Sequence, residues 1–225
     1  MGSPPEKGFG QGSPALARWA EETFRPEDDV LREIRERSAR EGLPGIQVGR
    51  MDGLHLEVLA RAAGARKAVE VGTLGGYSGV CLLRGMGSQG LLHTFELDPH
   101  HAEVARRSFE LAGFARQAHI HVGAAREKLR EVEADGPFDL VFIDADKQGY
   151  PAYLAWAEEH LRLGGIVLGD NAFAFGHVHE TSPSGEDASA VAPLRAFAER
   201  LATGGRFRAT MIPTEEGLAM GVKVR

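Results

Sequence analysis

The sequence predicts an α/β fold in which helices cover both faces of a mostly parallel β-sheet. Short apolar runs typical of buried strands alternate with segments of helical periodicity from Gly49 to about Asn171. This alternation indicates βαβ units, whose right-handed crossovers place helices on both faces of the sheet. The chain has 225 residues, of which 43% are hydrophobic, enough for the core of one full-sized domain.

The N-terminal part of the chain is expected to be a tail followed by two helices. Residues 1–13 are rich in Gly, Pro and Ser and lack apolar periodicity, which indicates a flexible tail. A helix is expected over 14–24 and a second, highly charged helix over 26–41. In the second helix, opposite charges stand four residues apart at Asp28/Arg32, Glu33/Arg37 and Glu36/Arg40.

The remaining residues are expected to form a single domain. This domain spans 14–225, and residues 14–47 are its helical extension, which is either a solvated surface or a lid or dimer contact. Further helices are expected over 51–63, 76–86, 101–112, 126–132, 150–161 and 190–201. Strands are expected over 67–71, 91–95, 119–122, 138–143, 165–170, 207–212 and 217–224. A turn at 213–216 makes the last two strands a terminal hairpin.

Composition excludes several classes of protein. A net charge of −6 argues against a general nucleic-acid binder, which needs a basic surface. The single cysteine, Cys81, excludes an intramolecular disulfide framework and Cys-rich zinc clusters. No apolar run reaches the roughly 18 residues of a membrane span, and the N-terminus lacks a signal-peptide core. We therefore expect a soluble, cytoplasmic protein without a membrane partner.

The ends of the first two predicted strands carry a candidate nucleotide site. A turn with Gly72, Gly75 and Gly76 follows the first strand, and glycines there let the backbone approach a ligand closely. Such a turn is a weak signal by itself. Glu96 follows the second strand, where a carboxylate is placed to accept hydrogen bonds from ribose hydroxyls. The alternative is a surface acid, but the preceding Gly-rich turn favours the ribose ligand.

The ends of the fourth and fifth strands carry a candidate metal site. Asp144 follows one strand, and Asp170 and Asn171 follow the next, so these side chains converge if the strands are neighbours. Two carboxylates and an amide make an all-oxygen site, which suits Mg²⁺ or Ca²⁺ rather than zinc. Unrelated strand-end acids are the alternative. Lys147 lies one turn after Asp144, and its amine could point to a ligand on that metal.

Together these motifs resemble a known family. VEVGTLGGYS, FELD, FDLVFIDADK, GGIVLGDN and a late GLAM segment are similar to class I S-adenosylmethionine-dependent methyltransferases. More narrowly, they resemble the cation-dependent O-methyltransferases, which include catechol and caffeoyl-coenzyme A O-methyltransferases. The resemblance runs from about Leu31 to the C-terminus. It implies a Rossmann-like sheet of seven strands, mostly parallel, with an antiparallel C-terminal strand.

The resemblance also implies a set of ligands. They are S-adenosyl-L-methionine as methyl donor, a divalent cation, usually Mg²⁺, and a small aromatic acceptor with two vicinal oxygens. It further implies a homodimer.

The resemblance implies a role for each residue that matches a family motif. The donor contacts are Val48, Glu70, Gly72, Ser78, Glu96, Ala125 and Asp144. Among them, Glu70 and Gly72 line the methionine side, Glu96 takes the ribose hydroxyls and Ala125 contacts adenine. The metal ligands are Asp144, Asp170 and Asn171. Lys147 matches the residue commonly assigned as general base.

Two departures from the family and two alternatives remain. Glu216 stands where the family often has Asp, and residues 172–175 differ from the family's acceptor-pocket pair. The polar stretch 176–189 leaves the acceptor unidentified. An NAD-dependent dehydrogenase is the alternative enzyme, disfavoured by the spacing of the glycines and by the unexplained Asp170–Asn171 pair. The non-enzymatic alternative is a binding module that has lost turnover, although no residue of the catalytic set is missing.

Overall fold

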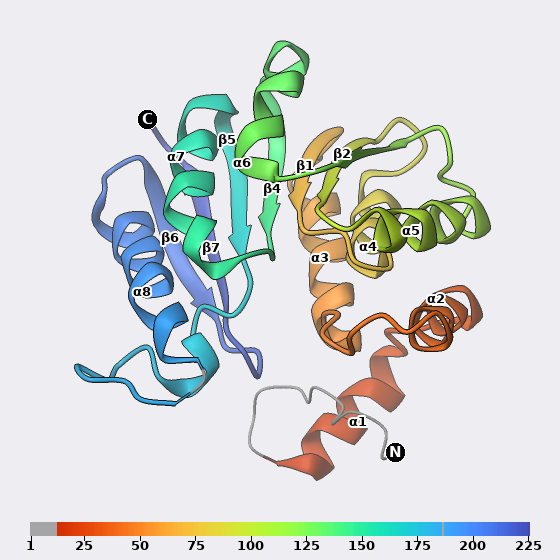
Figure 1. Cartoon of the computed structure of the whole chain (residues 1–225), viewed down its shortest axis with the longest axis horizontal. Coiled ribbons are helices and arrows are strands. Elements are labelled where there is room, and N and C mark those ends of the chain that lie inside the picture. The colour runs from red at the N-terminus through yellow and green to blue at the C-terminus, as the bar shows by residue number, and fades with distance from the viewer. Residues whose placement is uncertain (1–12, 186) are drawn as a thin grey trace.

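The computed structural model describes residues 13–185 and 187–225. In this part of the chain, seven strands form one sheet in the order β3-β2-β1-β4-β5-β7-β6 (Figure 1). Strands β1 to β5 run parallel, whereas β7 runs antiparallel to both of its neighbours, β5 and β6. The bounds are β1 Lys67–Val71, β2 Leu91–Glu96, β3 Ala118–Val122, β4 Phe138–Ile143, β5 Leu161–Gly169, β6 Phe207–Ile212 and β7 Leu218–Lys223. The predicted mixed sheet and terminal hairpin are confirmed.

The helices connect these strands and pack on both faces of the sheet, as predicted. Their bounds are α1 Pro14–Phe24, α2 Asp29–Arg40, α3 Arg50–Ala62, α4 Tyr77–Met86, α5 Pro99–Leu111, α6 Ala125–Lys128, α7 Tyr150–His160 and α8 Ala188–Thr203. Short 3₁₀ helices are η1 Leu129–Asp135, η2 Lys147–Gly149 and η3 Ala174–Gly176. None of the helices in the described residues is long and apolar enough to cross a membrane.

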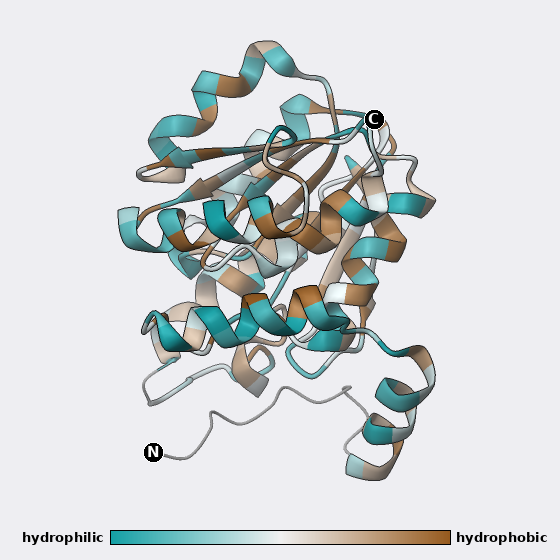
Figure 2. Ribbon diagram, turned by 90° about the vertical axis from the view of Figure 1, so that its right-hand side faces the viewer, coloured by the Kyte–Doolittle hydropathy of each residue, from teal (hydrophilic) through white to brown (hydrophobic). Residues whose placement is uncertain are grey.

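Alternation along the strands divides the core into two layers. Side chains of successive strand residues point to opposite faces, so Val69 of β1 packs in the layer under α7 and α8. Its neighbour Ala68 packs in the layer under α3, α4 and α5. Figure 2 shows the hydrophobic residues concentrated in the sheet and the hydrophilic ones along the outer sides of the helices. With both faces covered, the sheet leaves its carboxyl ends as the place for a ligand.

Two predicted element boundaries are wrong for physical reasons. The helix expected over 126–132 is a single α-helical turn followed by the 3₁₀ helix η1. The buried side chains of η1, Leu129 and Val132, are three residues apart, and the 3₁₀ repeat aligns such residues on one side. Strand β5 begins at Leu161 rather than at 165 because Leu161 pairs with Phe138 ahead of a register shift.

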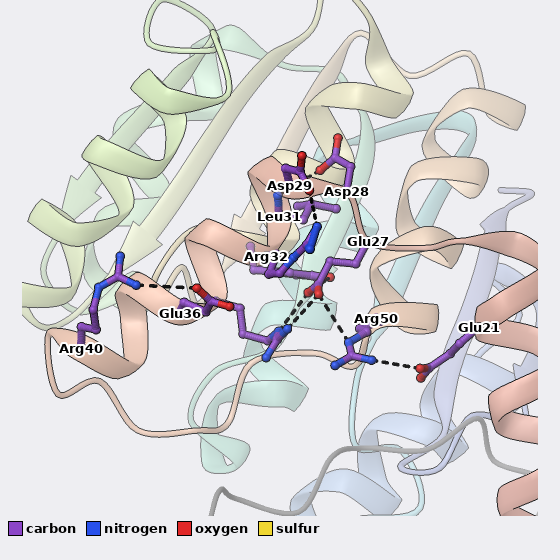
Figure 3. A network of polar contacts seen from close by, with 11 residues as sticks. Glu21, Glu27, Asp28, Asp29, Leu31, Arg32, Glu36, Arg40 and Arg50 are labelled. Atoms are coloured by element: carbon purple, nitrogen blue, oxygen red, sulfur yellow. Dashed lines mark hydrogen bonds and ion pairs between the residues drawn. The ribbon is translucent and has the colours of Figure 1, made fainter.

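The charged helix α2 also begins later than expected. Its N-cap is Asp28, whose side chain accepts a hydrogen bond from the backbone N–H of Leu31 at 3.0 Å. Asp28 does not form the predicted pair with Arg32: it accepts a hydrogen bond from Arg84 of α4, and Arg32 pairs with Asp29. The pair Glu33/Arg37 is formed as predicted. So is the pair Glu36/Arg40 (Figure 3).

Ion pairs attach the helical extension to the domain. Arg50, the first residue of α3, reaches Glu21 of α1 at 3.1 Å and Glu27 at 3.5 Å (Figure 3). Glu27 also accepts two hydrogen bonds from Arg35 of α2. Burial opposes the charge on Glu27, but the two arginines prevail and lower the pKa of its carboxyl. The expected tail lies, except for Ser13, outside the described residues, and the division into tail and single domain stays a prediction.

Candidate active site

A cavity of about 790 Å³ opens at the carboxyl ends of β1, β2 and β4. Its wall includes most of the predicted site residues: Val48, Gly72, Ser78, Glu96, Ala125, Asp144, Lys147 and Asn171. The other two, Glu70 and Asp170, are buried and do not belong to the wall. Residues that are far apart in the sequence therefore meet at the edge where open parallel sheets bind ligands.

The Gly-rich turn after β1 is tied to the neighbouring strand ends. Gly72 has φ +97°, and its backbone N–H donates to the carbonyl of Phe95 on β2 at 3.0 Å. On the other side, the N–H of Asp144 donates to the carbonyl of Val71 at 2.8 Å. A left-handed φ without steric cost requires glycine at position 72. The turn thus holds the ends of β2 and β4 in a common frame around the cavity.

Glu96 is held in a defined orientation by backbone donors. Its Oε2 accepts from the N–H groups of Thr73 at 3.3 Å and Leu74 at 2.7 Å, and its Oε1 accepts from Asp98 N–H at 3.0 Å. Only 8% of the residue is exposed, yet it borders the cavity. A carboxylate has about four acceptor positions. Glu96 can therefore accept from a ligand hydroxyl while it keeps the Gly-rich turn in place.

Glu70 lies directly behind the cavity wall. Its Oε1 accepts from the hydroxyl of Ser78 at 2.7 Å and its Oε2 from the hydroxyl of Thr94 at 2.6 Å. Burial raises the pKa of the Glu70 carboxyl to about 7, although both hydrogen bonds favour the ionised form. Of these two predicted donor contacts, Ser78 faces the cavity, whereas Glu70 lies behind Ser78 and accepts its hydrogen bond.

The three predicted metal ligands come from two adjacent strand ends. Ile143 pairs with Gly169 at the end of the β4–β5 ladder, and Asp170 N–H donates to the Ile143 carbonyl at 3.0 Å. Asp144 and Asp170 thus follow directly on neighbouring strands, as predicted. Asn171 adopts φ +55°, a left-handed conformation that Asn tolerates better than most residues.

The donor chemistry of this set fits a hard divalent cation. The amide nitrogen of Asn171 donates to the carboxylate of Glu216, so its oxygen is the atom left for a ligand. Two carboxylates and an amide oxygen are ligands of the kind that Mg²⁺ takes. Among the residues that the structure describes, His, Cys, Asp and Glu alone form no group of three that could hold a metal. The amide of Asn171 is therefore needed to complete a set of three.

Lys147 lies beside Asp144 in the wall of the cavity. It is the first residue of η2, and its Nζ is 3.1 Å from Oδ1 of Asp144. About a fifth of its side chain is exposed, and it borders the cavity. The amine is thus close to the candidate cation ligands and open to a small molecule in the cavity.

Comparison with known proteins identifies the family. A family model described as O-methyltransferase matches residues 21–224. The chain belongs to the O-methyltransferase family. Among curated relatives, a catechol O-methyltransferase of Mycobacterium tuberculosis is 41% identical over 182 residues, which cover 81% of each chain. A catechol O-methyltransferase of Niastella koreensis is 39% identical over 154 residues, covering 68% of this chain and 70% of the relative.

Solved structures agree with this assignment. An O-methyltransferase from Bacillus cereus in complex with SAH is 34% identical and superposes with a TM-score of 0.85. The match covers 93% of this chain and 97% of that one. The resemblance seen in the motifs is confirmed, as is the Rossmann-like fold. The dehydrogenase alternative finds no support in these matches.

The structure adds three site residues of this O-methyltransferase that the sequence did not single out. Tyr150 is fully buried, and its hydroxyl lies 3.2 Å from Nζ of Lys147. Tyr153 borders the cavity and donates to Asp146 at 2.5 Å. Thr94 donates to Glu70 from the neighbouring strand. The spacing of three residues between Lys147 and Tyr150, within a turn, was the available signal for the first of them.

The segment that departs from the family pattern, residues 172–175, contributes to the cavity wall. Phe175 borders the cavity with φ +56° and is 38% exposed. Phe173 packs against Gly217: a Cβ built on Gly217 would lie only 2.8 Å from the ring of Phe173. In the loop that follows, Nδ1 of His177 lies 2.6 Å from Oε1 of Glu180. Backbone bonds from Ala172 and Phe173 to the 216–217 turn hold this segment.

Proposed function

We propose that this O-methyltransferase transfers the methyl group of S-adenosyl-L-methionine to one hydroxyl of a vicinal dihydroxy aromatic compound, with Mg²⁺ as cofactor. One observation carries the proposal. Glu96, placed to bind ribose hydroxyls, lines the same cavity as Asp144 and Asn171, whose oxygens are candidate cation ligands. Asp170 is buried next to Asn171. The cavity volume, about 790 Å³, lies in the range of small-molecule sites and has room for two reactants.

The relatives support the donor and the class of acceptor. Both curated relatives reported above are named catechol O-methyltransferases, and the Bacillus cereus structure contains SAH. On this chain, Glu96 accepts hydrogen bonds from the ribose hydroxyls and Ala125 lies against adenine. Val48 contacts the methyl donor from the N-terminal side. Ser78, Gly72 and Asp144 face the methionine part, with Glu70 behind them.

Asp144, Asp170 and Asn171 are the proposed ligands of the divalent cation. A cation bound there supplies Lewis-acid chemistry: it lowers the pKa of an acceptor hydroxyl and fixes its orientation. The set leaves room for further oxygen ligands, which Mg²⁺ requires to reach six. Two vicinal hydroxyls offer such a pair of oxygens. A single phenol offers only one, so the proposed acceptor has two.

Lys147 is the proposed general base. Its amine takes the proton of the reacting hydroxyl, and the resulting oxygen attacks the methyl carbon in line with sulfur. The O–CH₃ bond forms as the S–CH₃ bond breaks, and the electron pair of the broken bond stays on sulfur to give a neutral thioether. Positioning contributes much of the rate, since two small reactants must meet in line.

The direct experiment offers the protein a panel of acceptors. Purified protein is incubated with donor, Mg²⁺ and catechols, with monophenols of matched size as controls, and products are measured by mass spectrometry. We expect singly methylated catechols and no methylated monophenol. Equal methylation of both classes would contradict two-oxygen recognition, and donor binding without any product would contradict the acceptor class. The homodimer and the cytoplasmic location stay predictions.

A further inference from the structure

Tyr150 occupies an unusual place beside the proposed base. It is the first residue of α7 and follows η2, the 3₁₀ turn that begins with Lys147. Residues three apart in a 3₁₀ turn lie over one another, so the two side chains are stacked. The Lys147 Nζ is 3.2 Å from the Tyr150 hydroxyl and 5.0 Å from the centre of its ring. Tyr150 itself is completely buried.

The hydroxyl of Tyr150 has two further partners, both backbone carbonyls. It lies 3.1 Å from the carbonyl oxygen of Ile143 and 3.1 Å from that of Asp170. These carbonyls belong to the residue before Asp144 on β4 and to the first residue after β5. One phenol thus contacts both strand ends that carry the candidate cation ligands, and the proposed base as well.

Counting protons gives the direction of each hydrogen bond. A phenol has one proton to donate and can accept through its oxygen lone pairs. Carbonyl oxygens only accept, so the Tyr150 proton goes to Ile143 or Asp170. In the hydrogen bond between Lys147 and Tyr150, the amine must therefore be the donor and the phenol oxygen the acceptor.

We infer that Tyr150 is a positioning residue for Lys147. Its hydroxyl takes one N–H of the amine and Asp144 takes another at 3.1 Å, so the head of a flexible side chain is held between two fixed acceptors. The ring is itself held by edge-on packing against Phe197 of α8, with centroids 5.3 Å apart. This inference rests on the proposed function, because it assigns Tyr150 to the same methyl transfer.

A purely structural role is the competing interpretation. Without the hydroxyl, two buried carbonyls would lose a donor, and the ends of β4 and β5 could shift without any involvement of Lys147. The two interpretations differ in a double-mutant cycle, since a residue that acts through Lys147 has nothing left to position once the amine is gone. Tyr150→Phe removes the hydroxyl and keeps the ring, whereas Lys147→Met keeps the stem and removes the amine.

The experiment measures kcat, KM for donor and for catechol, and donor affinity by calorimetry, in wild type, Tyr150→Phe, Lys147→Met and the double variant. We expect Tyr150→Phe to lower kcat roughly ten- to hundred-fold, the scale of a displaced catalytic group. Both KM values and the donor affinity stay within about two-fold. In the Lys147→Met background, Tyr150→Phe changes kcat by less than about three-fold. Leu201→Ala is the packing control: it removes a buried side chain from the same core layer, where Leu201 lies against Gly221 of β7, and we expect a lower melting temperature with kcat nearly unchanged.

The possible failures are distinguishable. If Tyr150→Phe leaves kcat unchanged, or lowers it equally in both backgrounds, the positioning role is wrong while the base assignment stands. A fall in kcat that Leu201→Ala reproduces at equal loss of melting temperature also overturns it, because lost packing then explains the effect. If Lys147→Met keeps a rate within a few-fold of wild type, the base assignment itself is wrong and the inference falls with it.

Discussion

Gly72 and Asp144 are in direct backbone contact at the centre of the candidate site. Gly72 belongs to the Gly-rich turn on the donor side, and Asp144 is a proposed cation ligand. A Cβ built on Gly72 would lie only 1.9 Å from the carbonyl oxygen of Asp144. No side chain fits at that distance, so the two halves of the site can be this close only with glycine at position 72.

Replacing Gly72 with alanine is therefore expected to damage fold and donor site together. The clash and the left-handed φ of +97° should lower the free energy of unfolding by about 2–4 kcal/mol. Gly113→Ala is the matched control, because Gly113 has φ +81° but open space around it; its cost should be about 1 kcal/mol. Urea unfolding and calorimetry with S-adenosylhomocysteine measure both effects. Equal costs for the two variants would contradict the close contact.

Glu96 is expected to contribute directly to donor affinity. Glu96→Ala removes an acceptor that faces the cavity and should weaken S-adenosylmethionine binding by about 1–3 kcal/mol, the scale of hydrogen bonds to a charged group. Glu103→Ala is the control on the same side of the sheet, since Glu103 is exposed and pairs with Arg106 on α5. Calorimetry would show the difference. An unchanged affinity in Glu96→Ala would contradict a contact between Glu96 and the methyl donor.

Acid should destabilise the protein through a histidine that is not part of the cavity wall. His93 on β2 is 4% exposed, its Nδ1 is 3.1 Å from Nε2 of His121, and Asp135 lies 3.4 Å from its other nitrogen. Burial, followed by the neighbouring His121, lowers the pKa of His93 from 6.5 to about 4. Below pH 6.5 the unfolded chain takes up a proton that the folded chain refuses until about pH 4, so stability falls over that window.

The expected loss is on the order of 2–3 kcal/mol between pH 6.5 and 4, as follows from a shift of this size. Urea unfolding, monitored by tryptophan fluorescence at a series of pH values, measures this loss of stability. His93→Gln removes the titrating group, and the slope over this window should become shallower. A slope that is the same in both proteins would show that His93 does not cause the acid sensitivity.

Much of the fold followed from local patterns. Strand β4 and strand β6 have the predicted bounds, because a short, mostly apolar run between turn signals has few alternatives. The neighbouring positions of β4 and β5 followed from the expected topology, which is why Asp144 and Asp170 could be placed together before the structure was known. The terminal hairpin was likewise visible in the turn between β6 and β7.

What the sequence did not reveal depends on tertiary contacts. Asp28 pairs with Arg84 from a distant helix, so a rule for isolated helices assigned it to the wrong arginine. Glu70 lies behind Ser78, where Thr94 of β2 donates a hydrogen bond to it. This contact depends on the register of β1 and β2, which has no local signature in the sequence. Tyr150 looked like the start of a helix, and only the packed strand ends show that its hydroxyl meets Lys147.

The most direct test of the central claim separates donor binding from methyl transfer by removing divalent cations. Protein treated with EDTA and freed of chelator is assayed with donor and catechol, and donor affinity is measured on the same sample. We expect no methylated catechol until Mg²⁺ or Mn²⁺ is added, which should restore the product. Donor affinity should be essentially unchanged, because Glu96 and the Gly-rich turn are independent of the cation. Full methyl transfer by the EDTA-treated protein before any divalent cation is added would contradict the proposed role of Asp144, Asp170 and Asn171.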